Sequence, residues 1–184
     1  MKIVCLGDSL VYGYGVPRKD CWITLAAQRT GHELVNRGLN GDTTGGMLAR
    51  FRPCVLDQSP RRVLLLGGAN DILTGNTDAV ARSNLSAMVY QALDAGIAPM
   101  VGLYPPFRPE KAGPPWTGFV DVQALAGTFS AYRDWVLRFA SAAGVPVVDF
   151  AAGFDSGDLY LDEVHPNRAG HQRMAEAFCT AIQH

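Results

Sequence analysis

The 184-residue chain lacks the features that would place it in a membrane or among secreted proteins. No apolar run reaches the roughly 18 residues that a membrane-spanning helix needs. Met1 and Lys2 lead directly into a strand-like run, without the apolar region and cleavage site of a signal peptide. We therefore expect a cytoplasmic protein with no stable membrane insertion, and a removed leader stays open as the alternative.

A large excess of charge of one sign is also missing. Lys and Arg total 16 against 17 Asp and Glu, which gives a net charge of −1. The adjacent basic pairs Arg18-Lys19 and Arg61-Arg62 are too short to follow a phosphate backbone or an anionic membrane surface. No nucleic-acid partner is expected, and the oligomeric state is left open.

Cysteines are few, and none stands in a Cys-x-x-Cys or paired metal-ligand spacing. Each lies in an apolar or helix-like stretch, which favours buried reduced thiols over disulfides in a chain of this size. No metal or cofactor is expected. The four are Cys5, Cys21, Cys54 and Cys179.

What is present is an alternation of short apolar runs with longer amphipathic patterns, typical of βα units around a parallel sheet. Expected strands are Lys2–Leu6, Glu33–Asn36, Arg62–Leu66, Ala98–Leu103 and Val145–Asp149. Expected helices are 21–31, 43–56 with a kink or split at Pro53, 77–95, 122–143 and 168–182. The pattern predicts one α/β domain over residues 1–184, a three-layer α/β/α sandwich with a flavodoxin-like five-stranded parallel sheet.

Four polar segments follow or lie beyond these strands, where open α/β sheets bind ligands. They are Gly7–Leu10, the Gly41 segment that precedes a helix, Gly67–Asp71, and Asp162–His165. A glycine N–H at a helix start and an Asn amide can both stabilise an anion. Taken singly, each segment is also explained by ordinary turn chemistry.

Asp162 and His165 lie three residues apart on what we expect to be a helical-type turn, so the carboxylate can accept from one ring nitrogen. The other nitrogen is then free to take a proton from a serine. A surface histidine beside a local carboxylate is the alternative. The remaining histidines have no carboxylate at comparable spacing.

Together and in this order, the four segments resemble the sequence blocks of the SGNH hydrolase superfamily, the GDSL lipases and esterases. The resemblance covers the chain from its first strand to its last helix. It implies that Ser9 is the nucleophile, His165 its general base and later acid, and Asp162 the residue that orients the imidazole. It also implies an oxyanion hole made by the Ser9 N–H, the Gly41 N–H and the Asn70 amide.

The same resemblance assigns bracing roles to Asp8 and Asp71. Ala69 departs from the family pattern, in which Thr or a similar residue is frequent, but its side chain is not an expected participant. The α/β-hydrolase motif Gly-x-Ser-x-Gly is absent.

Substrate choice is expected to depend on the segment 104–119, which is rich in Pro, Gly and aromatic residues. Phe107, Trp116 and Phe119 are the candidates for an acyl-pocket wall; a loop that packs on the protein itself is the alternative. Tyr12 and Tyr14 follow the proposed nucleophile closely and are candidates to line the crevice; a core or capping position is the alternative that we favour.

The resulting hypothesis is a metal-independent hydrolase of short- to medium-chain carboxylic esters that works through an acyl-enzyme. Acyl thioesterase, lysophospholipase or carbohydrate O-acetylesterase activity would use the same triad. Two alternatives come from other classes of protein. One is a flavodoxin-like domain that binds a small ligand such as a flavin or nucleotide. The other is a metal hydrolase that uses Asp8, Asp162 and His165.

Overall fold

The computed structural model describes residues 1–75, 78–113 and 121–183. Five parallel strands form one sheet in the order β2-β1-β3-β4-β5, which confirms the predicted flavodoxin-like topology. The strands are β1 (Lys2–Gly7), β2 (Glu33–Gly38), β3 (Arg62–Leu66), β4 (Ala98–Leu103) and β5 (Val147–Asp149).

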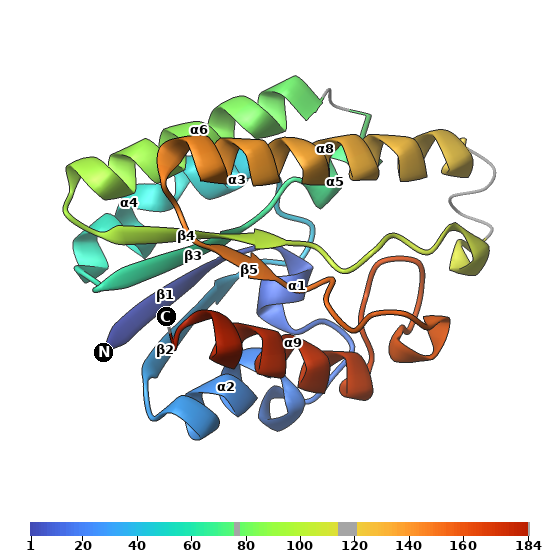
Figure 1. Cartoon of the computed structure of the whole chain (residues 1–184), viewed down its shortest axis with the longest axis horizontal. Helices are drawn as coiled ribbons and strands as arrows, with labels where there is room; N and C mark the ends of the chain where they lie inside the picture. The colour runs from blue at the N-terminus through green and yellow to red at the C-terminus, as the bar shows by residue number, and fades with distance from the viewer. Residues whose placement is uncertain (76–77, 114–120, 184) are drawn as a thin grey trace.

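Helices cover both faces of the sheet (Figure 1). On one face lie α3 (Thr44–Ala49), α4 (Phe51–Cys54), α5 (Ala69–Leu73), α6 (Asp78–Asp94) and α8 (Val122–Ala143). On the other lie α1 (Ser9–Tyr12), α2 (Trp22–Thr30) and α9 (Arg168–Ala181). Short 3-10 turns are η1 (Arg18–Asp20), η2 (Leu56–Gln58), η3 (Pro109–Lys111) and η4 (Gly157–Leu159).

Side chains of the central strands alternate between the two faces of the sheet and contribute to a hydrophobic core on each face. In β1, Val4 and Leu6 pack under the α6 and α8 layer, whereas Ile3 and Cys5 pack under the α2 and α9 layer. Successive side chains of a strand point to opposite faces, so an all-apolar strand fills both layers at once. That two-sided burial is why these runs are almost continuously apolar in the sequence.

The predicted helix over residues 43–56 is divided, but Pro53 is not the cause. The division falls at Arg50, which ends α3 and precedes α4. Pro53 is the third residue of α4, where a backbone N–H has no partner inside the helix and its loss costs nothing. The expected break at Pro53 is therefore wrong.

Other differences are at the ends of elements. β2 runs two residues beyond the expected Asn36, and β5 begins at Val147 because Pro146 has no N–H to donate to the ladder. The short helices α1 and α5 were not predicted.

All four cysteines are free. In the part of the chain that the structure describes, no helix has the length and apolar character needed to cross a membrane.

Candidate active site

Ser9 lies where β1 passes into α1, as its first helical residue. Asp8 caps this helix, and its Oδ1 accepts a hydrogen bond from the Leu10 N–H at 2.9 Å. A Cβ at Gly7 would lie 2.3 Å from the Leu66 carbonyl oxygen, so only glycine allows the strand to reach the turn at this point. The serine side chain is thereby held at the carboxyl edge of the sheet.

His165 and Asp162 meet Ser9 from the far end of the chain. His165 Nε2 lies 2.9 Å from Ser9 Oγ, and His165 Nδ1 lies 2.7 Å from Asp162 Oδ2. The other carboxylate oxygen, Asp162 Oδ1, accepts from the backbone N–H groups of Val164 and His165 at 3.0 and 2.7 Å. The contact thus comes from an Asx-type turn and not from the helical-type turn that we expected.

Backbone pairing fixes this turn. The Leu161 N–H donates to the His165 carbonyl at 2.8 Å, and Tyr160 pairs with Pro166 in an antiparallel bridge. Burial by itself would raise the pKa of Asp162, but the hydrogen bond from the His165 ring and the two backbone donors hold that pKa below its usual range. Asp162 is therefore an anion beside the imidazole at neutral pH.

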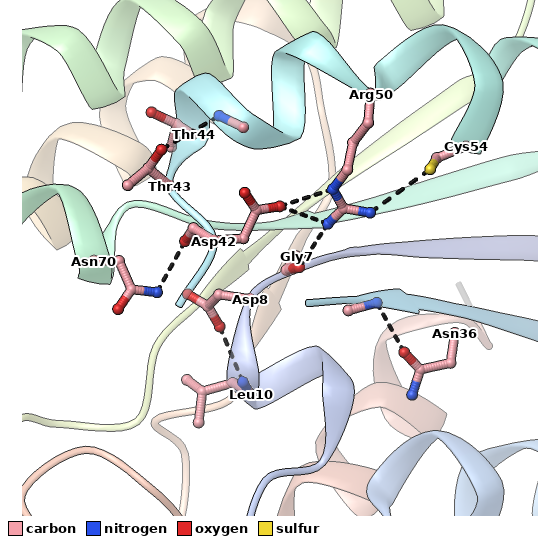
Figure 2. A network of polar contacts seen from close by, with 12 residues as sticks. Gly7, Asp8, Leu10, Asn36, Asp42, Thr43, Thr44, Arg50, Cys54 and Asn70 are labelled. Atoms are coloured by element: carbon pink, nitrogen blue, oxygen red, sulfur yellow. Dashed lines mark hydrogen bonds and ion pairs between the residues drawn. The ribbon is translucent and has the colours of Figure 1, made fainter. Parts of the chain in front are cut away.

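Asn70 lies in α5, and its Nδ2 donates to the Asp42 carbonyl at 2.8 Å (Figure 2). Gly41, one residue earlier, has φ +74, in the left-handed region that favours glycine. Thr43 then caps α3 by accepting from the Gly46 N–H. Asn70 lines the cavity that contains Ser9, whereas Gly41 is not among its lining residues.

Arg50 ties the Gly41–Asp42 segment to the nucleophile strand. Its guanidinium contacts Asp42 Oδ2 through Nε at 2.8 Å and Nη2 at 2.7 Å, and Nη2 also donates to the Gly7 carbonyl at 3.0 Å (Figure 2). This contact was not predicted from the sequence. Asp42 and Arg50, eight residues apart at the two ends of one short helix, were the available signal.

The two aspartates expected to brace the loops make contacts of that kind. Asp8 Oδ2 accepts from the Tyr104 hydroxyl at 2.7 Å, and burial above all raises the Asp8 pKa to about 6. Asp71 accepts from the N–H and the hydroxyl of Thr44 at 2.8 and 2.7 Å. Each carboxylate thus joins its own loop to a neighbouring element.

A cavity of about 270 Å³, here called the catalytic cleft, opens over these groups. One wall carries Tyr14, whose ring centroid lies 4.4 Å from that of His165. Tyr14 is 46% exposed and lines the cleft, so of its two interpretations the crevice position is the one the structure shows and the favoured core position is wrong. Tyr12 is equally exposed and lines a different hollow, so the core interpretation is wrong for it as well.

The lining of the catalytic cleft also includes Phe107, a candidate for the acyl-pocket wall, and Phe129 of α8, which was expected from the sequence only on a helix face. The two rings stack with centroids 4.9 Å apart. The other two candidates for a substrate wall, Trp116 and Phe119, lie outside the described residues.

Within residues 1–75, 78–113 and 121–183, no three His, Cys, Asp or Glu side chains gather so that they could hold a metal ion. In the metal alternative, Asp8 would be a ligand, but both of its oxygens already accept hydrogen bonds. The arrangement of Ser9, His165 and Asp162 is instead the one that nucleophilic catalysis of acyl transfer requires.

Comparison with known proteins agrees with this class. Residues 5–173 match the model of the GDSL-like lipase/acylhydrolase family. The chain belongs to that family, and so to the SGNH hydrolase superfamily.

An arylesterase of Vibrio mimicus is 43% identical over 101 residues, which are 52% of this chain and half of that relative. Esterase TesA of Pseudomonas aeruginosa is 27% identical over 180 residues, covering 95% of this chain and 84% of the relative. The aryl esterase of M. smegmatis has the same fold, with a TM-score of 0.85 at 20% identity over 99% of this chain and 98% of the other. The family match thus places the chain among lipases and acylhydrolases, whereas the M. smegmatis structure supports the fold alone.

Proposed function

We propose that residues 1–184 form one catalytic domain that hydrolyses short- to medium-chain carboxylic esters through an acyl-enzyme. The observation that carries the proposal is the continuous hydrogen-bonded chain from Ser9 Oγ through the His165 ring to Asp162, with distances of 2.9 and 2.7 Å. Ser9 and His165 come from opposite ends of the sequence, so a local turn does not explain their contact.

In this mechanism Ser9 Oγ attacks the ester carbonyl while His165 Nε2 takes its proton. His165 then gives the proton to the leaving alkoxide, and water repeats the sequence to release the acid. Asp162 holds the tautomer and stabilises the charged imidazole. The Ser9 N–H, the Gly41 N–H and the second N–H of the Asn70 amide are the proposed donors to the oxyanion.

Hydrolysis of p-nitrophenyl acetate and butyrate by the wild type, Ser9→Ala and Ser141→Ala tests the proposal. Ser141 is exposed on α8 and serves as the matched control. Ser9→Ala is expected to lose at least about 10³-fold in kcat, and Ser141→Ala to keep the wild-type rate. Equal rates in the wild type and Ser9→Ala would contradict the proposal.

The natural substrate stays open within this class. Thioesters, lysophospholipids and acetylated carbohydrates would react at the same serine. The expected cytoplasmic location likewise stays a prediction. If the wild type neither cleaves esters nor reacts with a serine-directed phosphonate, a flavodoxin-like domain that binds a small ligand becomes the better account.

A further inference from the structure

A second cavity, of about 190 Å³, adjoins the catalytic cleft. It lies between the end of β4 with the segment that follows and one face of α8, and we call it the side chamber. The two cavities share four lining residues: Tyr104, Pro105, Phe107 and Phe129. The stacked Phe107 and Phe129 rings belong to both linings and so stand between the two spaces.

The side chamber offers apolar surface although polar residues line it. The Tyr104 hydroxyl donates to Asp8, and the Tyr132 hydroxyl donates to the Gly67 carbonyl at 2.9 Å. Arg133 pairs with Asp149, with both contacts at 3.3 Å. These polar groups already have partners. Besides Ser130, whose side chain is exposed, this leaves mainly Leu103, Val136 and the proline and phenylalanine rings to contact a ligand. An uncharged hydrocarbon chain suits such a lining.

The position of His165 decides which half of an ester faces the side chamber. The imidazole must protonate the leaving alkoxide, so the alcohol half lies on the His165 side of the catalytic cleft. That side is lined by Tyr14 and the segment from Asp162 to His165, and none of these residues lines the side chamber. The chamber adjoins the part of the cleft that Phe107 and Phe129 line, which leaves that part for the acyl half.

We infer that the side chamber is the acyl-chain subsite of this enzyme, entered past the Phe107–Phe129 pair. This inference rests on the proposed function and gives it a substrate class: esters whose acyl chain is longer than acetyl and ends between β4 and α8. Chain-length preference is then set by the residues that line the chamber, of which Ala126 and Ser130 on α8 are the smallest after Gly102.

The test compares the ratio kcat/KM for p-nitrophenyl esters from acetate to dodecanoate in the wild type, Ala126→Leu and Ala142→Leu. The leucine at position 126 enters the chamber, whereas Ala142 is exposed near the end of the same helix and lines neither cavity. We expect Ala126→Leu to lose about fourfold in kcat/KM for each methylene that it displaces from the chamber, with the acetate value within about threefold of wild type. Ala142→Leu should keep the wild-type profile.

Ser130→Leu gives a second test, because Ser130 is exposed and its substitution does not strain the core. An unchanged chain-length profile in both Ala126→Leu and Ser130→Leu, with acetate hydrolysis still dependent on Ser9, overturns the subsite and leaves the proposed function standing. A series of acetate esters with longer alcohols tests the other half of the substrate. If the two variants lose kcat/KM selectively on the longer alcohols, the chamber binds the alcohol half and the inference is overturned. A wild type that cleaves no ester and takes no label at Ser9 overturns both.

Discussion

Asn70 illustrates how one side chain in this site combines a structural and a proposed catalytic contact. Its amide nitrogen carries two hydrogens, and one of them is used by the Asp42 carbonyl at 2.8 Å. That contact fixes the rotamer of the amide at the edge of the catalytic cleft. The second N–H is then held in place before substrate arrives, which is what makes an oxyanion donor effective.

Replacing Asn70 by Ala is expected to lower kcat about 10²–10³-fold with a much smaller change in KM, because the lost donor acts on charge that develops in the transition state. Steady-state kinetics on p-nitrophenyl butyrate measure both parameters. Asn84→Ala is the matched control, since the Asn84 amide donates to the Thr44 hydroxyl on α3 and does not line the catalytic cleft. A kcat for Asn70→Ala within about threefold of wild type would remove Asn70 from the oxyanion hole.

At the scale of elements, the contact between α1 and β2 sets the position of the nucleophile. A Cβ at Gly38, the last residue of β2, would lie 2.0 Å from the Tyr12 backbone nitrogen. Tyr12 ends the four-residue helix that Ser9 begins. The close approach of the two backbones therefore depends on a glycine at this position.

Gly38→Ala should lower the free energy of unfolding by about 1–3 kcal/mol and reduce kcat as well, since relief of the clash moves α1. Gly127→Ala is the control, because Gly127 lies in α8 with no atom within 4 Å of an added Cβ. That variant should gain about 0.5–1 kcal/mol from the better helix former. Urea unfolding measures both, and equal stabilities of the two variants would show that α1 does not rest on β2 in this way.

His171 links two helices in a way that depends on pH. It lies buried in α9, and its Nδ1 accepts from the Trp22 N–H at the start of α2, at 3.3 Å. Burial lowers the His171 pKa to about 4 from the ordinary 6.5. Between these values the unfolded chain binds more protons than the folded one, so the contribution of His171 to stability is complete above about pH 6.5 and is lost as the pH falls toward 4.

The wild type is therefore expected to lose about 2–3 kcal/mol more than His171→Asn does when the pH is lowered from 7 to 4. Urea unfolding of both proteins across this range gives the difference. The difference between the two proteins isolates the effect of His171. Asp8, whose pKa is raised, titrates over the same pH range and changes the free energy of unfolding in the opposite direction. Parallel stability curves for the two proteins would show that His171 is not buried in its neutral form.

The sequence predicts the long elements better than the short ones. β3 and β4 have the expected bounds because two glycines follow the first run and two prolines lie just beyond the second. α1 and α5, of four and five residues, are too short to show a helical period. The division of α3 from α4 depends on Arg50 reaching Asp42 and the Gly7 carbonyl, a tertiary contact that local spacing does not contain.

At the scale of the whole molecule, the order β2-β1-β3-β4-β5 brings the ends of β1, β2 and β3 to neighbouring positions on one edge. The turn with Asp162 and His165 reaches the same edge after β5 (Figure 1). Because this topology follows from the alternation of strands and helices, the meeting of the four polar segments was predictable. The position of Phe129 was not, since only the assembled tertiary structure shows that this residue of α8 faces a cavity.

Every step of the proposed mechanism depends on Ser9 being the nucleophile. The most direct test is reaction of the wild type with a serine-directed alkyl phosphonate, followed by mass spectrometry of its peptides. We expect one stoichiometric adduct on Ser9, formed more slowly in Asp162→Asn because its imidazole loses the anion that orients it. An adduct on any other serine, or no adduct in a protein that hydrolyses esters, would contradict that role of Ser9.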